Sequence, residues 1–187
     1  MGGVPSVYVV NPAPDGPSCH TGEAYQAGDG AGWVPVADLA SVTVAALVPA
    51  DWTVRITDEA IDPVDFGAAV DFVAITGKVA QRRRMYAIAS EFRRRGRTVL
   101  IGGPFASLNP EDVEGHADIL VTGELEDLAP RLFADLAAGR WSPRYDGEKA
   151  DLDRAPLPRW DLSPLTRASL GAIQTSRGCP FDCESVM

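Results

Sequence analysis

Residues 72–104 read FVAITGKVAQRRRMYAIASEFRRRGRTVLIGGP, and this stretch decides the fold. Short apolar runs at 72–75 and 98–101 have the length of buried strands. Between them lie four apolar residues at the spacing of one helix face: Met85, Ile88, Ala89 and Phe92. Gly96 follows as the residue that ends the helix. The order strand, helix, strand predicts two parallel strands joined by a crossover helix.

The same alternation continues on both sides of this unit. Further strands are expected at 6–10, 53–57 and 119–121, and further helices at 36–48 and along the apolar stripe of 125–136. Five short strands that alternate with helices predict an α/β fold, a doubly wound parallel sheet of the Rossmann or flavodoxin-like class.

The chain of 187 residues is too short for a second complete domain of barrel type, which takes about 250 residues. We expect residues 1–140 to form the α/β domain and residues 141–171 to form an extended, Pro-rich linker. Residues 172–187 are expected to start a second domain, with a strand at Ala172–Thr175.

Composition narrows the class of partner. Hydrophobic residues make up 45% and charged residues 23%, as in ordinary globular proteins, and the net charge of −9 disfavours nucleic acid and anionic membranes. No apolar run is long enough to span a membrane, and three cysteines make no disulfide framework. These features favour a cytoplasmic protein with a small-molecule partner, and they do not identify a protein partner.

Ligands of open parallel sheets bind outside the carboxyl ends of the strands. The residues expected there are small or polar: Asn11, Thr76, Gly77, Gly102, Gly103, Thr122, Gly123 and Glu124. Glycines let a backbone approach a flat or bulky ligand, so the set predicts a cofactor site. The alternative is that each glycine only makes a tight turn between a strand and a helix.

Other candidate sites are weaker. The first turn begins Asn11-Pro12 and lacks the glycine pattern that seats a pyrophosphate, so Asp58 is interpreted as a strand-end acid rather than a ribose ligand. The long stretch 12–35 is either functional or disordered. Cys19-His20 and His116 lack the partners that catalysis needs and are interpreted as structural or surface residues.

The segment from Thr175 to Cys183 reads TSRGCPFDC and contains a candidate metal-binding motif. Cys179 and Cys183 are spaced C-x-x-x-C on a loop, where two thiolates can share an iron-sulfur cluster. The segment resembles the cluster-binding start of the radical S-adenosylmethionine enzymes, whose motif is C-x-x-x-C-x-x-C.

The remainder of the chain resembles the cobalamin-binding domain that precedes the barrel in one branch of that family. Four pieces carry the resemblance: FVAITG at 72–77, IGGPF at 101–105 with NPE at 109–111, ILVTGELE at 119–126 and PLPRWDL at 156–162. The resemblance implies that the chain binds cobalamin through the strand ends, and that intact relatives use a 4Fe-4S cluster and S-adenosylmethionine for methyl transfer or related radical chemistry.

Two departures limit what the resemblance implies. Val186 stands where the third cluster cysteine is expected, so the chain as given should not hold a stable cluster or cleave S-adenosylmethionine. Neither His20 nor His116 lies in the pattern D-x-H-x-x-G that supplies an axial ligand of cobalamin. The chain is therefore expected to be a catalytically incomplete cobalamin-binding part, and the alternatives are a separate cobalamin carrier or a general α/β domain for a nucleotide or protein.

Overall fold

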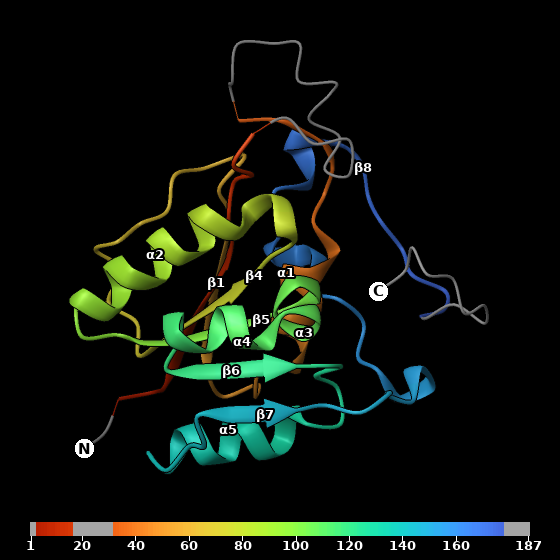
Figure 1. Ribbon diagram of the computed structural model, residues 1–187. Coiled ribbons are helices and arrows are strands. Elements are labelled where there is room, and N and C mark those ends of the chain that lie inside the picture. The colour runs from red at the N-terminus through yellow and green to blue at the C-terminus, as the bar shows by residue number, and fades with distance from the viewer. Residues whose placement is uncertain (1–2, 17–31, 178–187) are drawn as a thin grey trace.

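The computed structural model describes residues 3–16 and 32–177. Its centre is a six-stranded parallel sheet with the strand order β3-β1-β4-β5-β6-β7 (Figure 1). The strands are β1 (Ser6–Asn11), β3 (Thr53–Asp58), β4 (Phe72–Thr76), β5 (Thr98–Gly102), β6 (Ile119–Thr122) and β7 (Arg144–Asp146). The α/β class and the parallel pairing predicted from the sequence are confirmed.

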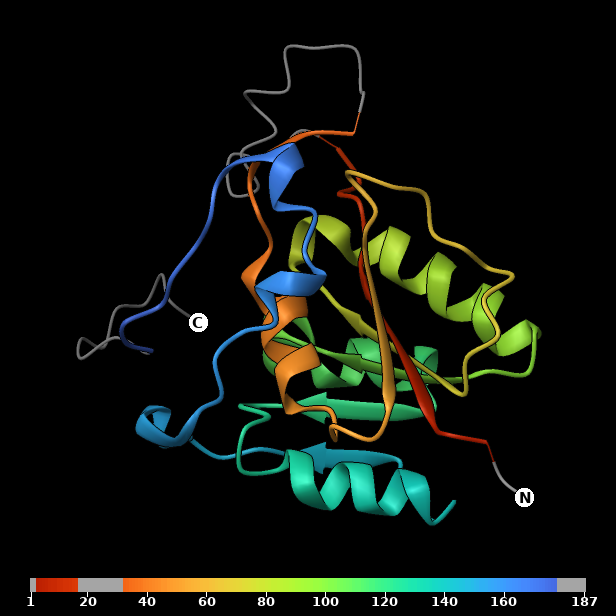
Figure 2. The same ribbon diagram turned by 180° about the vertical axis from the view of Figure 1, so that it is seen from behind.

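Helices cover both faces of the sheet. The α-helices of the described residues are α1 (Leu39–Leu47), α2 (Arg82–Arg94), α3 (Pro104–Leu108), α4 (Pro110–Val113) and α5 (Ala129–Ala137). Short 3-10 turns are η2 (Val79–Gln81), η3 (Glu114–His116), η4 (Leu152–Arg154), η5 (Trp160–Leu162) and η6 (Leu165–Arg167). Helices α2, α3 and α4 lie on one face, and α1 and α5 lie on the other (Figures 1 and 2).

The alternation of side chains along each strand produces two separate apolar clusters. Tyr8, Ile75 and Ile101 belong to the cluster under α2, α3 and α4. Their neighbours Val9 and Leu100 belong to the cluster shared with α5. Each central strand therefore contributes to both cores, as expected for a parallel sheet that is covered on both sides.

Local signals set the helix boundaries. The carboxylate of Asp38 accepts a hydrogen bond from the backbone N–H of Ser41 at 2.7 Å, so α1 begins at Leu39, inside the predicted range 36–48. Gly96 has a φ of +75° directly after the end of α2, as the sequence predicted. Helix α5 begins only at Ala129, four residues after the start of the predicted apolar stripe 125–136.

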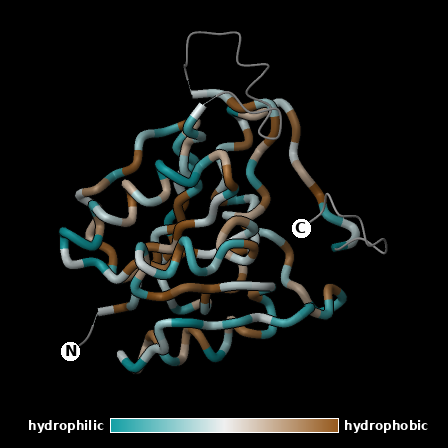
Figure 3. Tube along the Cα trace, viewed as in Figure 1, coloured by the Kyte–Doolittle hydropathy of each residue, from teal (hydrophilic) through white to brown (hydrophobic). Residues whose placement is uncertain are grey.

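One strand of the sheet was missed by the sequence analysis. The structure adds β7, so the sheet has six strands instead of the expected five, and it continues into the segment 141–171 that was predicted to be a linker. Strand β7 reads Arg-Tyr-Asp and is hydrophilic along its length (Figure 3), with only Tyr145 buried. A three-residue edge strand with one buried side chain gives no detectable alternation.

The prediction of a strand at Ala172–Thr175 is wrong. These residues have no strand conformation, and the preceding residues form β8 (Ala168–Leu170), which pairs in parallel with β2 (Val34–Val36) in a small second sheet. Apolar composition favoured a strand at 172–175, but a strand also needs a partner. The partner strand β2 is in register with 168–170.

The linker is fastened to the α/β domain at several points. The backbone N–H of Arg159 donates to the carbonyl of Val42 in α1 at 3.0 Å. The guanidinium of Arg167 forms a two-point ion pair with Asp62, with Nη1 and Oδ1 2.9 Å apart. The linker therefore lies against the domain rather than extending away from it. Among the described residues, no helix has the length and apolar character needed to cross a membrane.

Candidate functional site: a cavity at the carboxyl edge of the sheet

A cavity of about 1060 Å³ opens at the carboxyl edge of the six-stranded sheet and continues along the face that carries α1 and α5. Ligand pockets of proteins usually have volumes of about 300–1,000 Å³, so this cavity can take a large organic cofactor. Its place agrees with the general rule that ligands of open α/β sheets bind at the carboxyl ends of the strands.

The floor of the cavity is apolar and belongs to the middle of the sheet. Val9, Ala74 and Leu100 line it, and they are neighbours in register on β1, β4 and β5. Ala74 is only partly buried although it lies on a central strand. The small methyl side chain leaves room that a larger residue would fill.

The positions of the two helices explain why this part of the sheet is uncovered. Helix α1 packs on β1 and β3. Helix α5 lies beside β7, where the Tyr145 hydroxyl donates to the Asp135 carboxylate at 2.7 Å (Figure 1). The face of β4 and β5 lies between the two helices, and their side chains form the cavity walls: Val44 and Leu47 from α1, and Leu132 and Leu136 from α5.

A polar rim continues this floor at the carboxyl edge. Asn11 is in register with Asp58, and Thr76 is in register with Gly102. Each of these four residues lies two positions after a residue that belongs to the floor or is paired in register with a floor residue. Because side chains alternate along a strand, all four lie on the same face of the sheet as the floor. All four line the cavity. The site therefore combines an apolar floor with a rim of hydrogen-bonding groups.

Asp58 is the most perturbed group of the rim. It is 9% exposed, and burial together with the nearby charge of Asp38 raises its pKa to about 6. Hydrogen bonds from the Ala60 N–H and the Asn11 side chain, and the positive charge of Lys78, lower the pKa in part. Near pH 6 the side chain therefore changes from a hydrogen-bond donor to an acceptor facing the cavity.

Gln81 joins the ends of β1 and β4. Its Nε2 donates to the Asn11 side-chain oxygen at 2.8 Å and to the Pro12 carbonyl at 2.5 Å. Its Oε1 accepts from the backbone N–H of Lys78 at 2.8 Å. Because Gln81 is buried and fully engaged, it fixes the orientation of Asn11 at the rim.

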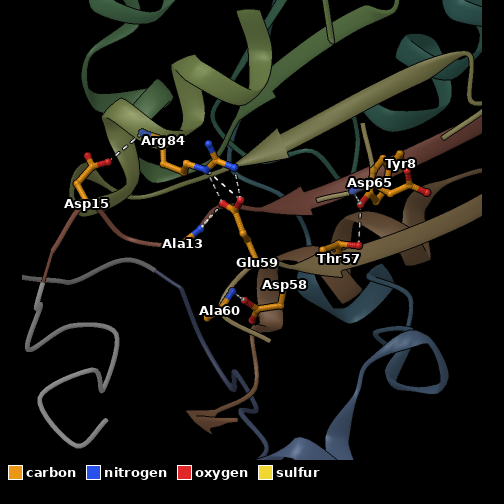
Figure 4. A network of polar contacts seen from close by, with 9 residues as sticks. All are labelled: Tyr8, Ala13, Asp15, Thr57, Asp58, Glu59, Ala60, Asp65 and Arg84. Carbon is orange, nitrogen blue, oxygen red and sulfur yellow. Dashed lines mark hydrogen bonds and ion pairs between the residues drawn. The ribbon is translucent and has the colours of Figure 1, made fainter. Parts of the chain in front are cut away.

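The start of the first loop is held against α2 (Figure 4). Both carboxylate oxygens of Asp15 accept backbone N–H groups at the start of α2, from Arg83 at 2.8 Å and from Arg84 at 2.9 Å. Glu59 accepts from the Ala13 N–H at 3.0 Å and pairs with the Arg84 guanidinium. The helix terminus that would otherwise attract a phosphate is thus occupied by the protein's own carboxylate.

The structure brings most of the predicted site residues to the cavity. Six of the eight line it: Asn11, Thr76, Gly102, Gly103, Gly123 and Glu124. Thr122 does not, because alternation turns it to the other face, where its hydroxyl contacts the Asp146 carboxylate at 2.5 Å. Gly77 does not line it either, and its Cα faces the Met85 sulfur.

At two of these positions the local backbone requires glycine. Gly103 has a φ of +95°, and a Cβ there would lie 2.7 Å from the Thr76 hydroxyl oxygen. Gly123 has a φ of +70°, and a Cβ there would overlap the backbone of Gly147. The tight-turn interpretation is therefore correct for both positions, and both glycines also line the cavity.

Cys179 and Cys183, the predicted cluster ligands, lie outside the described residues, as do Cys19 and His20. Within residues 3–16 and 32–177, no group of three or more His, Cys, Asp or Glu side chains is arranged to hold a metal ion. His116 stacks on the Tyr86 ring with centroids 3.7 Å apart, in agreement with a structural role.

Several cavity residues were not identified from the sequence. Asp38, Lys78, Gln81 and Arg177 all line the cavity. Asp58 lines the cavity as well, and alternation along β3 would have placed it on the face of Ile56 and hence on the cavity side. The four residues named before it lie on loops and turns, where no periodic pattern gives the direction of a side chain.

The relatives that the chain resembles are methyltransferases. It is 34% identical over 159 residues to bacteriochlorophyllide d C-8(2)-methyltransferase of Chlorobaculum tepidum, which covers 80% of this chain and 35% of that protein. It is 33% identical over 150 residues to hopanoid C-2 methylase of Rhodopseudomonas palustris, which covers 76% of this chain and 28% of that protein. The chain thus spans about a third of the length of these relatives.

No protein-family model matches the chain. Among solved structures, the N-terminal domain of a hypothetical protein from Thermotoga maritima overlaps 46% of this chain and 73% of its own, with a TM-score of 0.38 and 22% identity.

Proposed function

We propose that the chain binds cobalamin in the cavity at the carboxyl edge of its sheet, as part of a cobalamin-dependent radical S-adenosylmethionine methyltransferase. The observation that carries the proposal is the continuous cavity from the polar rim to the apolar floor between α1 and α5. Two lines of support join it: the resemblance in sequence to cobalamin-binding domains, and the methyltransferase relatives.

The residues present fit this cofactor. Cobalamin is large, carries many amide groups around a flat ring and has a nucleotide tail with an apolar base. Hydrogen-bonding groups at Asn11, Asp58 and Thr76 suit the amides, and the floor at Ala74 and Leu100 suits an apolar group. Bound cobalamin would supply a carrier for a methyl group.

The chain's own residues would bind and orient the cofactor. Gly102 and Gly103 let the backbone come close to it. The buried network of Gln81 and Asn11 keeps one rim donor and acceptor in place before binding, which lowers the entropic cost of association. The apolar walls exclude water from the part of the cofactor that enters the sheet face.

A 4Fe-4S cluster does not fit the sequence in the same way. Cys179 and Cys183 lie outside the described residues, and Val186 occupies the third ligand position of the motif. Two thiolates do not complete the ligand set of such a cluster. The proposed role of this chain is therefore to bind a cofactor in the cytoplasm, without nucleic acid or membrane as a partner and without cleavage of S-adenosylmethionine.

A nucleotide site is the alternative that the structure favours least. Phosphates of nucleotides commonly bind at the N-terminus of the helix that follows a strand. At α2 this place is taken by Asp15, whose carboxylate would repel a phosphate.

Optical titration with hydroxocobalamin tests the proposal. We expect the folded chain to change the cobalamin absorption spectrum with saturation at one equivalent, and Ala74→Phe, which fills the floor, to abolish the change. Ala137→Phe adds the same side chain on the exposed side of α5 and serves as the matched control. Absence of a saturable change with folded wild-type protein, or an equal loss in both variants, would refute the proposal.

A further inference from the structure

The end of the linker forms part of the cavity wall. Ala172, Ile173, Gln174 and Arg177 line the cavity although they follow the α/β domain by many residues. Figure 2 shows this segment running down from β8 on the side of α1 and standing away from the helix. The cavity therefore lies between the sheet on one side and the segment 172–177 on the other, as a ligand held between two walls would require.

Arg177 attaches the far end of this segment to the sheet edge. Its guanidinium pairs with the Glu124 carboxylate at 3.3 Å and with the Glu126 carboxylate at 2.5 Å. The side chain of Glu126 is 6% exposed and that of Arg177 is 21% exposed. Burial alone would raise the pKa of Glu126, but the adjacent Arg177 guanidinium holds it below its ordinary value. A partly buried, shared ion pair of this kind restricts the segment more than exposed pairs do.

The near end of the segment is held as well. Strand β8 pairs with β2, and the backbone N–H of Ala37 donates to the Leu170 carbonyl at 2.8 Å. Glu124, at the other end, also accepts from the Ala150 N–H at 2.9 Å and so has a fixed position. Residues 171–177 are therefore anchored at both ends.

Ile173 lies in the middle of this anchored segment. Its side chain is 86% exposed, yet it lines the cavity. Leu157, elsewhere in the linker, is equally exposed at 89% but does not line the cavity. An exposed apolar side chain at the wall of a cavity offers area that a ligand can bury.

We propose that residues 172–177 form the second wall of the ligand site, with Ile173 as an apolar contact to the ligand and Arg177 as the residue that positions the wall. The inference rests on the proposed function for the choice of ligand. The flat corrin ring of cobalamin would then lie between the carboxyl edge of the sheet and this segment.

Equilibrium binding of hydroxocobalamin tests the contact. We expect Ile173→Ser to weaken binding about tenfold, because a ligand that buries this side chain gains about the transfer free energy of its lost carbons. Leu157→Ser changes a side chain of equal exposure outside the cavity, and we expect it to leave affinity unchanged. Equal affinities of Ile173→Ser and wild type would overturn the contact.

The positioning role of Arg177 has its own test. We expect Arg177→Gln to weaken binding several-fold while the variant stays folded at the temperature of the titration, and Arg177→Lys to restore part of the lost affinity. Arg154→Gln removes an exposed linker ion pair, with Asp151, as the matched control. An unchanged affinity in Arg177→Gln, or an equal change in Arg154→Gln, would overturn it.

A probe that does not depend on cobalamin separates the two proposals. The amphiphilic anionic dye 8-anilinonaphthalene-1-sulfonate reports access to apolar cavities by its fluorescence. If wild type fails to bind hydroxocobalamin, the proposed function is wrong, but dye binding that falls in Ile173→Ser and not in Leu157→Ser still supports the second wall. Equal dye binding in both variants overturns the wall on its own.

Discussion

On the face of the sheet that carries α2, α3 and α4, Val73 and Ile101 are buried in a closed core, whereas on the opposite face Ala74 stays partly exposed at the floor of a cavity. These residues are neighbours on the same central strands. The comparison shows how a parallel sheet separates two tasks by alternation, since one set of positions supplies stability and the next set is left free to bind.

The largest expected effect is a difference in stability between two matched truncations of a side chain, one on each face of the sheet. Ile88 on α2 is fully buried in the closed core, and Leu136 on α5 borders the cavity. We expect Ile88→Ala to lower the free energy of unfolding by about 4 kcal/mol and Leu136→Ala by about 2 kcal/mol, because the second site has fewer packed neighbours to lose. Urea unfolding measures both. Equal losses would mean that the open face is packed as tightly as the closed one.

The opposite change, adding volume, should reverse the pattern. Ala89 is fully buried on α2, and Ala74 faces the cavity. We expect Ala89→Phe to destabilise the protein by about 3 kcal/mol through overpacking, and Ala74→Phe to stay within about 1 kcal/mol of wild type. Thermal unfolding followed by circular dichroism compares them. A large loss in Ala74→Phe would contradict an open floor.

A smaller effect concerns the rim and depends on pH. The pKa of Asp58 is raised to about 6, so the folded state binds more protons there than the unfolded state does, and stability falls as pH rises from about 4 to about 6. We expect Asp58→Asn to remove this part of the pH dependence. The free energy of unfolding of the variant, relative to that of wild type, should therefore rise by about 2 kcal/mol between pH 4 and pH 7.5. Urea unfolding at both values checks it. A constant difference would show that Asp58 titrates normally.

The closed face could be predicted from the sequence to a large extent. The spacing of Met85, Ile88, Ala89 and Phe92 identified the buried side of α2, and Gly96 marked its end. Short apolar runs identified five of the six strands. Periodicity reports burial, so it works best where burial is complete. It failed at β7, where only Tyr145 is buried, and at 172–175, where a neighbouring segment took the partner strand.

The open face could be predicted only in part. The rule for parallel sheets selected Asn11, Thr76 and Gly102 at the carboxyl edge, where the structure has the cavity, and it also selected Thr122, whose side chain lies on the other face. The cavity itself depends on the separation of α1 and α5 on the sheet, which no local pattern encodes. The contribution of Arg177 depends on the return of the linker, a contact between residues far apart in sequence.

The small sheet of β2 and β8 has a consequence for the order of folding. Val34 pairs with Ala168, and almost the whole domain lies between them in sequence. Closing so long a loop before the domain is compact would cost conformational entropy that a few backbone hydrogen bonds cannot offset. We therefore expect the two strands to pair after the six-stranded sheet has formed, and the linker to be the last part of the described chain to reach its native place.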